Sequence, residues 1–154
     1  MKLKRALLFS LLFFFSLAVF AQTAADMDVL LKTGSVNAAQ AANFVLGAAD
    51  LLPAGVSGAA AEKAAYETAV SKGWIKAASG DALTLKDTAF LIMKAFDLKG
   101  GVMYSLFKNP RYAYREMVYR KLIQGRSDSS MKVSGPRLLQ IIDRTLAFKE
   151  GGAK

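Results

Sequence analysis

The 154-residue chain contains no cysteine and no histidine, and these two absences exclude several kinds of chemistry. Without cysteine there is no disulfide framework and no thiol nucleophile, and without either residue there is no Cys/His zinc site. The lack of histidine also removes the imidazole base of a Ser-His-Asp triad. Neither a GxxxxGK[ST] nor a GxGxxG motif occurs in the sequence. We therefore expect a non-catalytic protein that uses no metal and no cofactor.

Much of the apolar content lies at the N-terminus. Lys2, Lys4 and Arg5 precede an apolar run, and Ala21 is a small residue at a plausible cleavage position. The run over residues 6–20 is too short to cross a hydrocarbon core of about 30 Å. We predict a signal peptide that is removed after Ala21, and hence a periplasmic or extracellular protein with no transmembrane span after signal removal. An uncleaved membrane anchor is the alternative.

The charges of the remaining residues are unevenly distributed. Residues 22–98 carry six basic and eight acidic side chains, whereas residues 99–154 carry 12 basic and four acidic ones. An anionic partner is therefore expected to bind the C-terminal part of the chain. The export signal argues against nucleic acid as that partner.

Three segments have the periodicity of amphipathic helices with polar N-caps. The cap residues are Asn37, Thr84 and Ser134, and the helices are predicted to end near residues 52, 98 and 148. Gln40 and Asp87 follow the first two caps at the spacing of a capping box. Two further helices are predicted over residues 60–72 and 112–121, the second beginning near Pro110. The helix over residues 84–98 is apolar nearly all round and is expected to be central.

The predicted helices recur at a spacing of about 50 residues, which indicates helix-loop-helix repeats. Because one repeat cannot bury its apolar face alone, the copies are expected to pack as one small all-α domain. The predicted organisation is a signal peptide (1–21), a partial repeat (22–58), a first full repeat (59–101), a second full repeat with a basic tyrosine-rich segment (102–150), and a tail (151–154).

The pattern is best defined over residues 64–98, and it resembles the S-layer homology family. Gly73 matches the first glycine of that family's Gly-Ile-Ile-x-Gly turn and Gly125 matches the last, so each repeat keeps only one of the two. Thr84 and Asp87 resemble the ends of its Thr-Arg-Ala-Glu motif. The resemblance implies packed helical repeats and binding of an anionic cell-wall polysaccharide, to which the arginine of the motif contributes. That arginine position is occupied here by Leu85 and Gly135. The alternative is an array of helical hairpins that shares only the caps and the period.

A basic, tyrosine-rich segment lies between the repeats. Four of the five tyrosines fall within residues 103–121. A helix that starts at Pro110 would align Tyr112, Arg115 and Tyr119 on one face. Tyrosine rings and arginine guanidinium groups together suit an anionic sugar polymer, a lipid headgroup or an acidic protein surface. The candidate ligand-binding residues are Arg111, Tyr112, Arg115, Tyr119, Arg120, Lys121 and Arg126.

These observations predict an exported cell-envelope module that binds an anionic envelope polymer, peptidoglycan or a related glycan. In the alternative function, the same face meets an acidic protein surface, and the chain is a structural subunit of a periplasmic or envelope complex. A third interpretation is that the tyrosines pack inward and the arginines form a solvated face. Self-association is compatible with each of them, since a partial repeat can leave an uncovered edge.

Overall fold

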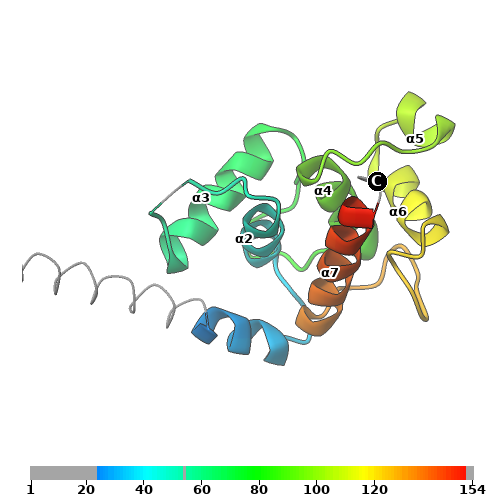
Figure 1. The fold of residues 1–154 in the computed structure, drawn as a ribbon. Helices are drawn as coiled ribbons and strands as arrows, with labels where there is room; N and C mark the ends of the chain where they lie inside the picture. The colour runs from blue at the N-terminus through cyan, green and yellow to red at the C-terminus, as the bar shows by residue number, and fades with distance from the viewer. Residues whose placement is uncertain (1–23, 54, 152–154) are drawn as a thin grey trace, which may run out of the picture.

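The computed structural model describes residues 24–53 and 55–151 (Figure 1). Within these ranges the chain forms an all-α domain, as predicted, and β-structure is limited to two isolated bridges. Residues 24–32 are helical. The helices that follow are α2 (Ala38–Ala48), α3 (Gly58–Ser71), α4 (Leu85–Ala95), α5 (Val102–Leu106), α6 (Pro110–Tyr119) and α7 (Gly135–Gly151). The predicted signal peptide and its cleavage site lie outside the described residues.

Two predicted N-caps initiate their helices through side-chain hydrogen bonds. The Asn37 side chain accepts from the Gln40 N–H at 2.8 Å, and the Gln40 side chain accepts from the Asn37 N–H, which completes the predicted capping box. The Thr84 side chain likewise accepts from the Asp87 N–H. The Asp87 carboxylate, however, accepts from the Thr84 hydroxyl and not from the Thr84 backbone N–H. The second cap is therefore a variant of the box.

The boundaries of α2 and α4 differ from the predicted ones, since both helices end earlier. Asp50 and Asp97 follow these helices with φ of 57° and 49°, in the left-handed region. The residue after each then donates to a carbonyl five residues earlier, as Leu98 does to Met93 at 2.9 Å, which is a Schellman ending. Leu51, within the predicted bounds of α2, lies beyond the helix and is 43% exposed.

The remaining predicted helices are present with small shifts. α3 and α6 each begin and end one or two residues before the predicted positions, and α7 continues three residues past position 148. Pro110 is the first residue of α6, as predicted. The sequence analysis missed the helix over residues 24–32 and the short helix α5.

Three backbone hydrogen bonds join the residues that precede the N-caps of α2, α4 and α7. The Val36 N–H donates to the Val133 carbonyl at 2.7 Å, the Val133 N–H to Leu83 at 3.2 Å, and the Leu83 N–H to Val36 at 3.0 Å. All three residues are buried. The bonds form a closed ring, called the backbone ring below, which holds the starts of the three helices together.

The first residue of each of these helices makes an equivalent contact outside the backbone ring. Its N–H donates to a carbonyl in the segment before another of the three helices. The pairs are Ala38 to Asp81 (2.9 Å), Leu85 to Met131 (2.8 Å) and Gly135 to Thr33 (2.9 Å). Backbone groups that a helix start leaves unpaired are thus satisfied in the same way at three places.

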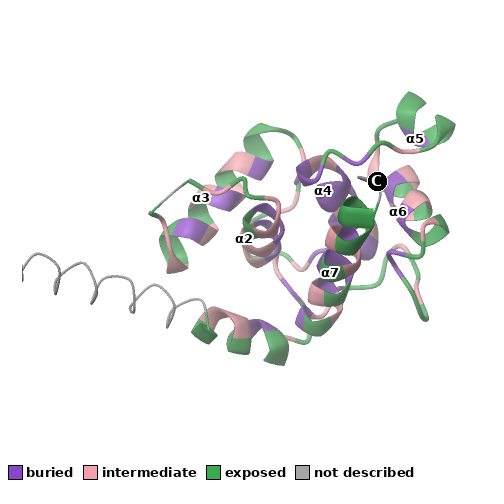
Figure 2. Cartoon of the chain, viewed as in Figure 1, coloured by how far each residue is buried: buried purple, intermediate pink, exposed green. Residues whose placement is uncertain are grey.

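The core is centred on α4, as predicted from its apolar character. Eight of its 11 residues are buried, and Figure 2 shows this helix as the most continuously buried one. α4 packs against α2 and α6, and α2 also contacts α3 and α7. Leu122 and Ile123, which follow α6, are buried, whereas Trp74, which follows α3, is half-buried. In the described part of the chain, no helix has both the length and the apolar character needed to cross a membrane.

Candidate functional site

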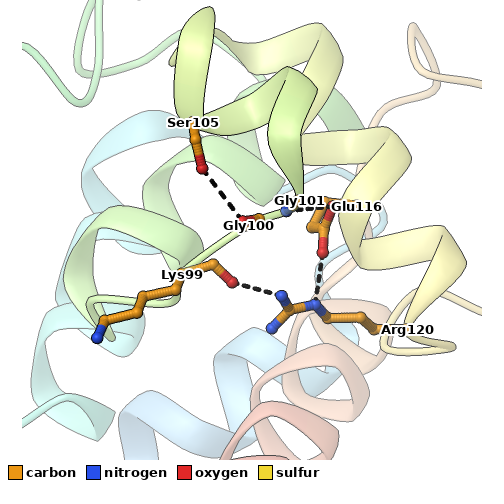
Figure 3. Close-up of polar contacts among 6 residues, drawn as sticks. All are labelled: Lys99, Gly100, Gly101, Ser105, Glu116 and Arg120. Atoms are coloured by element: carbon orange, nitrogen blue, oxygen red, sulfur yellow. Dashed lines mark hydrogen bonds and ion pairs between the residues drawn. The ribbon is translucent and has the colours of Figure 1, made fainter.

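The candidate site lies where α5 meets α6, and a polar network fixes the two helices there (Figure 3). The Glu116 carboxylate accepts from the Gly101 N–H at 3.0 Å through one oxygen and from Arg120 at 2.7 Å through the other. Arg120 also donates to the Lys99 carbonyl. The Arg120 and Glu116 side chains are only 20% and 14% exposed, so this ion pair holds the start of α5 against α6 from a sheltered position.

The beginning of α6 is set by Asn109, which the sequence analysis did not identify as a cap. Its side chain accepts from the Tyr112 N–H at 3.1 Å and places Pro110 at the first helical position. The helix then carries residues spaced by three and four on one face. Tyr112, Arg115 and Tyr119 therefore follow one another along the side of α6 that faces α5.

A shallow groove of about 270 Å³ runs between these two helices. It is lined by Gly101, Val102, Met103, Tyr104, Tyr112, Arg115, Glu116 and Tyr119. We call it the α5–α6 groove. The structure thus brings Tyr112, Arg115 and Tyr119 to one surface, at the spacing that the sequence predicted for them.

The three aligned residues differ in how they are held. Tyr112 is half-buried, and its ring stacks on Phe107 with centroids 5.6 Å apart. Tyr119 is 84% exposed, and Arg115 is exposed as well. Among the residues that the structure describes, neither Tyr119 nor Arg115 has a side-chain hydrogen bond or ion pair. A ligand in the groove would therefore meet one fixed ring, one exposed ring and one unpaired guanidinium.

The other four candidate residues do not line the α5–α6 groove. Arg120 is engaged within the fold, since it pairs with Glu116 and its guanidinium lies 5.1 Å from the Phe148 ring. Arg111, Lys121 and Arg126 are exposed on the surrounding surface. These three add positive charge near the groove without shaping it.

Two tyrosines of the segment pack inward, as the third interpretation expected. Tyr104 is only 5% exposed, and burial, together with the negative charge of Asp97, raises the pKa of its phenol. The Tyr114 hydroxyl donates to the Ser127 hydroxyl at 3.1 Å. Tyr104 and Tyr114 therefore hold the fold, and Tyr104 also contributes to the lining of the groove beside Tyr112 and Tyr119.

The positions that match the arginine of the S-layer motif are closed to ligands. Leu85 is buried, and so is Gly135. A Cβ added at Gly135 would lie 1.7 Å from the Leu30 carbonyl oxygen, so no larger residue fits there. Any contact with an anionic polymer must therefore be made elsewhere on the domain.

The sequence analysis did not identify the apolar surface of α5. Its large exposed residues, with Phe107 just beyond the helix, are Val102, Met103, Leu106 and Phe107. The sequence could have indicated this surface, because four of six consecutive residues are large and apolar in a segment too short to form a helix of the core.

A second cavity, of about 450 Å³, lies between α2, α3 and α7. Its lining is largely apolar, with Phe44, Leu52, Leu139 and Ile142 among its residues, and Asp26 is the one charged residue in it. An acidic residue in an apolar cavity does not favour an anionic ligand. This cavity is therefore a poorer match than the α5–α6 groove for the partner that the charge distribution predicts.

Across residues 24–53 and 55–151, no cluster of three acidic, His or Cys side chains is suited to holding a metal ion. No protein-family model, no curated protein and no solved structure matches this chain.

Proposed function

We propose that this domain is an exported, non-catalytic cell-envelope module that binds an anionic envelope polymer, peptidoglycan or a related glycan, in the α5–α6 groove. The observation that carries the proposal is the unpaired Arg115 between two tyrosines on one groove wall. A guanidinium group can grip a carboxylate with two parallel hydrogen bonds. Aromatic rings beside it offer apolar faces to sugar rings.

The chemistry of the surrounding surface supports an anionic ligand. Residues 99–126 contain seven basic side chains and a single acidic one, Glu116, which is already paired with Arg120. Long-range attraction would raise the local concentration of a polyanion near the groove. Binding of this kind weakens with added salt because exposed charges are screened.

We also propose that this domain is related to the S-layer homology family, on the basis of its helix order, its N-caps and the spacing of its helices. The equivalent contacts at the starts of α2, α4 and α7 support a helical-repeat origin. In this chain the proposed polymer site is displaced from the motif arginine, because Leu85 and Gly135 are buried. The domain would therefore keep the family's packing while binding its ligand on a different surface.

Sedimentation with purified peptidoglycan sacculi tests the polymer proposal. We expect salt-sensitive binding that Arg115→Ala with Tyr119→Ala weakens about tenfold or more, since two contacts of about 1 kcal/mol each are lost. Lys63→Ala with Val70→Ala is the matched control, because it removes one exposed cation and one exposed apolar side chain from α3. Unchanged binding of the groove variant would overturn the site.

A protein partner gives a different outcome in the same experiment. Capture of one stoichiometric protein from envelope extract, with no binding to sacculi, would contradict the polymer proposal. That result would favour the structural-subunit function. N-terminal sequencing of the exported protein tests the localisation, and we expect the first residue to be Gln22.

A further inference from the structure

The helix α5 exposes apolar side chains to an unusual degree. Val102 and Leu106 are 75% and 69% exposed, and they lie one helical turn apart on the same side of the helix. Met103 and Phe107 are about half exposed beside them. Exposed apolar groups gathered in one place are costly in water and commonly mark a surface of interaction.

α5 projects from the body of the domain. In Figure 1 it lies at the edge of the molecule, and its packing is against α6. Tyr104 is its one buried residue, and Figure 2 shows the rest of the helix mostly exposed. The exposed apolar side chains therefore stand on a protrusion, and two of them, Val102 and Met103, also line the α5–α6 groove.

The protrusion is nevertheless held in place. Glu116 fixes the Gly101 N–H at its start, and Ser105 donates to the Gly100 carbonyl at 3.2 Å. Gly100 packs so closely on Tyr104 that an added Cβ would lie 2.4 Å from the ring. A fixed geometry means that the apolar groups are already presented before a partner arrives.

Cations flank this apolar tip along the chain. Lys99, Lys108 and Arg111 are all exposed, and they lie before and after α5 in the sequence. Within the described residues, the side chains of Lys108 and Arg111 form no hydrogen bond or ion pair. The tip therefore combines apolar side chains with unpaired positive charge.

We propose that α5 inserts its apolar tip into the interface of an anionic phospholipid bilayer, while the flanking cations contact the lipid phosphates. A bilayer accepts a convex apolar protrusion without a pre-shaped pocket, and burial of the apolar groups drives the insertion. The negative surface potential of the membrane adds attraction for each nearby Lys or Arg. The apolar and the electrostatic contributions are each weak, and together they give stronger binding than either gives alone.

This inference goes beyond polymer binding, because the apolar tip and the polymer-binding side chains are different residues. Val102 and Leu106 carry the insertion, whereas Tyr112, Arg115 and Tyr119 carry the proposed polymer contact. Val102 also lines the α5–α6 groove, but Leu106 does not. The domain would thus lie against a membrane through α5 and reach an envelope polymer through the neighbouring groove.

Flotation with lipid vesicles tests the insertion, using the full chain as processed by the cells that produce it. We expect binding to vesicles of phosphatidylglycerol and phosphatidylcholine, and weaker binding to phosphatidylcholine alone. Val102→Ser with Leu106→Ser should weaken binding to the anionic vesicles about tenfold or more. Lys108→Gln with Arg111→Gln should weaken it as well and remove the preference for anionic lipid.

Val29→Ser with Leu31→Ser is the matched control, since these apolar residues are 57% and 50% exposed on the helix over residues 24–32. It should leave vesicle binding unchanged, and all variants should keep the thermal unfolding midpoint of the unmodified protein. Equal vesicle binding by the tip variant and the control would overturn the proposal. Self-association that the tip variant abolishes, without vesicle binding, would show a second copy on this surface and overturn it too.

The two proposals fail separately. Leu106→Ser alone should weaken vesicle binding and still sediment with sacculi, because Leu106 does not line the α5–α6 groove. If both proposals hold, the groove variant loses sacculus binding and keeps vesicle binding, whereas Leu106→Ser loses vesicle binding and keeps sacculus binding.

Discussion

The Glu116 carboxylate accepts a hydrogen bond from the Arg120 guanidinium one helical turn later, and its second oxygen accepts from the Gly101 N–H at the start of α5. Because both side chains are mostly buried, loss of the negative charge leaves Arg120 without its counterion. We expect Glu116→Gln to lower the free energy of unfolding by about 1–2 kcal/mol. Denaturant titration measures this change.

The exposed pair Lys63–Glu67 on α3 serves as the control for that prediction. Its atoms are 3.9 Å apart, and both side chains are largely exposed. Glu67→Gln should change the stability by less than about 0.5 kcal/mol, since exposed ion pairs contribute little. Equal effects of the two substitutions would show that burial does not strengthen the Glu116–Arg120 pair.

Gly135→Ala should be among the most damaging single substitutions in the domain. The added methyl group would lie 1.7 Å from the Leu30 carbonyl oxygen, so the helix over residues 24–32 and the start of α7 must separate. We expect a loss of about 3 kcal/mol or more, measured by thermal or denaturant unfolding. Gly80→Ala is the control, because the space around that position is open. A stable Gly135→Ala protein would contradict this packing.

Lys121→Gly should stabilise the protein. Lys121 follows α6 with φ of 59°, whereas the equivalent position after α3 is Gly73 with φ of 68°. A side chain in this left-handed region is strained, and glycine removes that strain at a smaller entropic cost. We expect a gain of about 0.5 kcal/mol for Lys121→Gly and a loss of about 1 kcal/mol for Gly73→Ala. A loss of stability for Lys121→Gly, or a gain for Gly73→Ala, in the same unfolding assay would refute the interpretation.

Thr88→Val should stabilise the core. In the part of the chain that the structure describes, Thr88 is the buried side chain whose hydroxyl has no hydrogen-bond partner. An isosteric methyl removes that unpaired group, and we expect a gain of about 1 kcal/mol. Thr145 is the control, because its buried hydroxyl donates to the Ile141 carbonyl at 2.8 Å. Thr145→Val should give no gain, and equal gains would argue against a specific effect at Thr88.

The buried Tyr104 should make the domain less stable in alkali. Burial, and secondarily the charge of Asp97, raises its pKa in the folded state above the ordinary value of 10.0. The contribution of this group to stability is therefore complete below pH 10.0 and is lost as the pH rises through the folded-state pKa. Tyr104→Phe should flatten the decline in the free energy of unfolding above that pH. An unchanged pH profile would show that Tyr104 does not contribute.

The beginnings of the helices could be predicted from the sequence because their causes are local. Asn37 and Thr84 each bond an N–H three residues ahead, and that spacing is visible in the letters. The ends were harder, because Asp50 and Asp97 stop α2 and α4 in a conformation usually adopted by glycine. The aspartate side chain gives no clear sign that its backbone will turn there.

The candidate site was partly predictable for the same reason. The alignment of Tyr112, Arg115 and Tyr119 follows from helical spacing once Pro110 begins α6. The engagement of Arg120 could also have been found, since Glu116 precedes it by four residues. The groove itself could not, because α5 lacks the apolar periodicity of a core helix and its position depends on tertiary contacts at Gly101.

The backbone ring also sets the order of events during folding. Val36 and Val133 lie near opposite ends of the described chain, and Leu83 lies between them. The ring cannot close until residue 133 has left the ribosome. Until then, the hydrogen bonds that join Val36 and Leu83 to Val133, just before α2 and α4, cannot form. Since closure of a long loop precedes the gain from its contacts, we expect the domain to fold only once residue 133 is available, slowly for an all-α protein and as one cooperative unit.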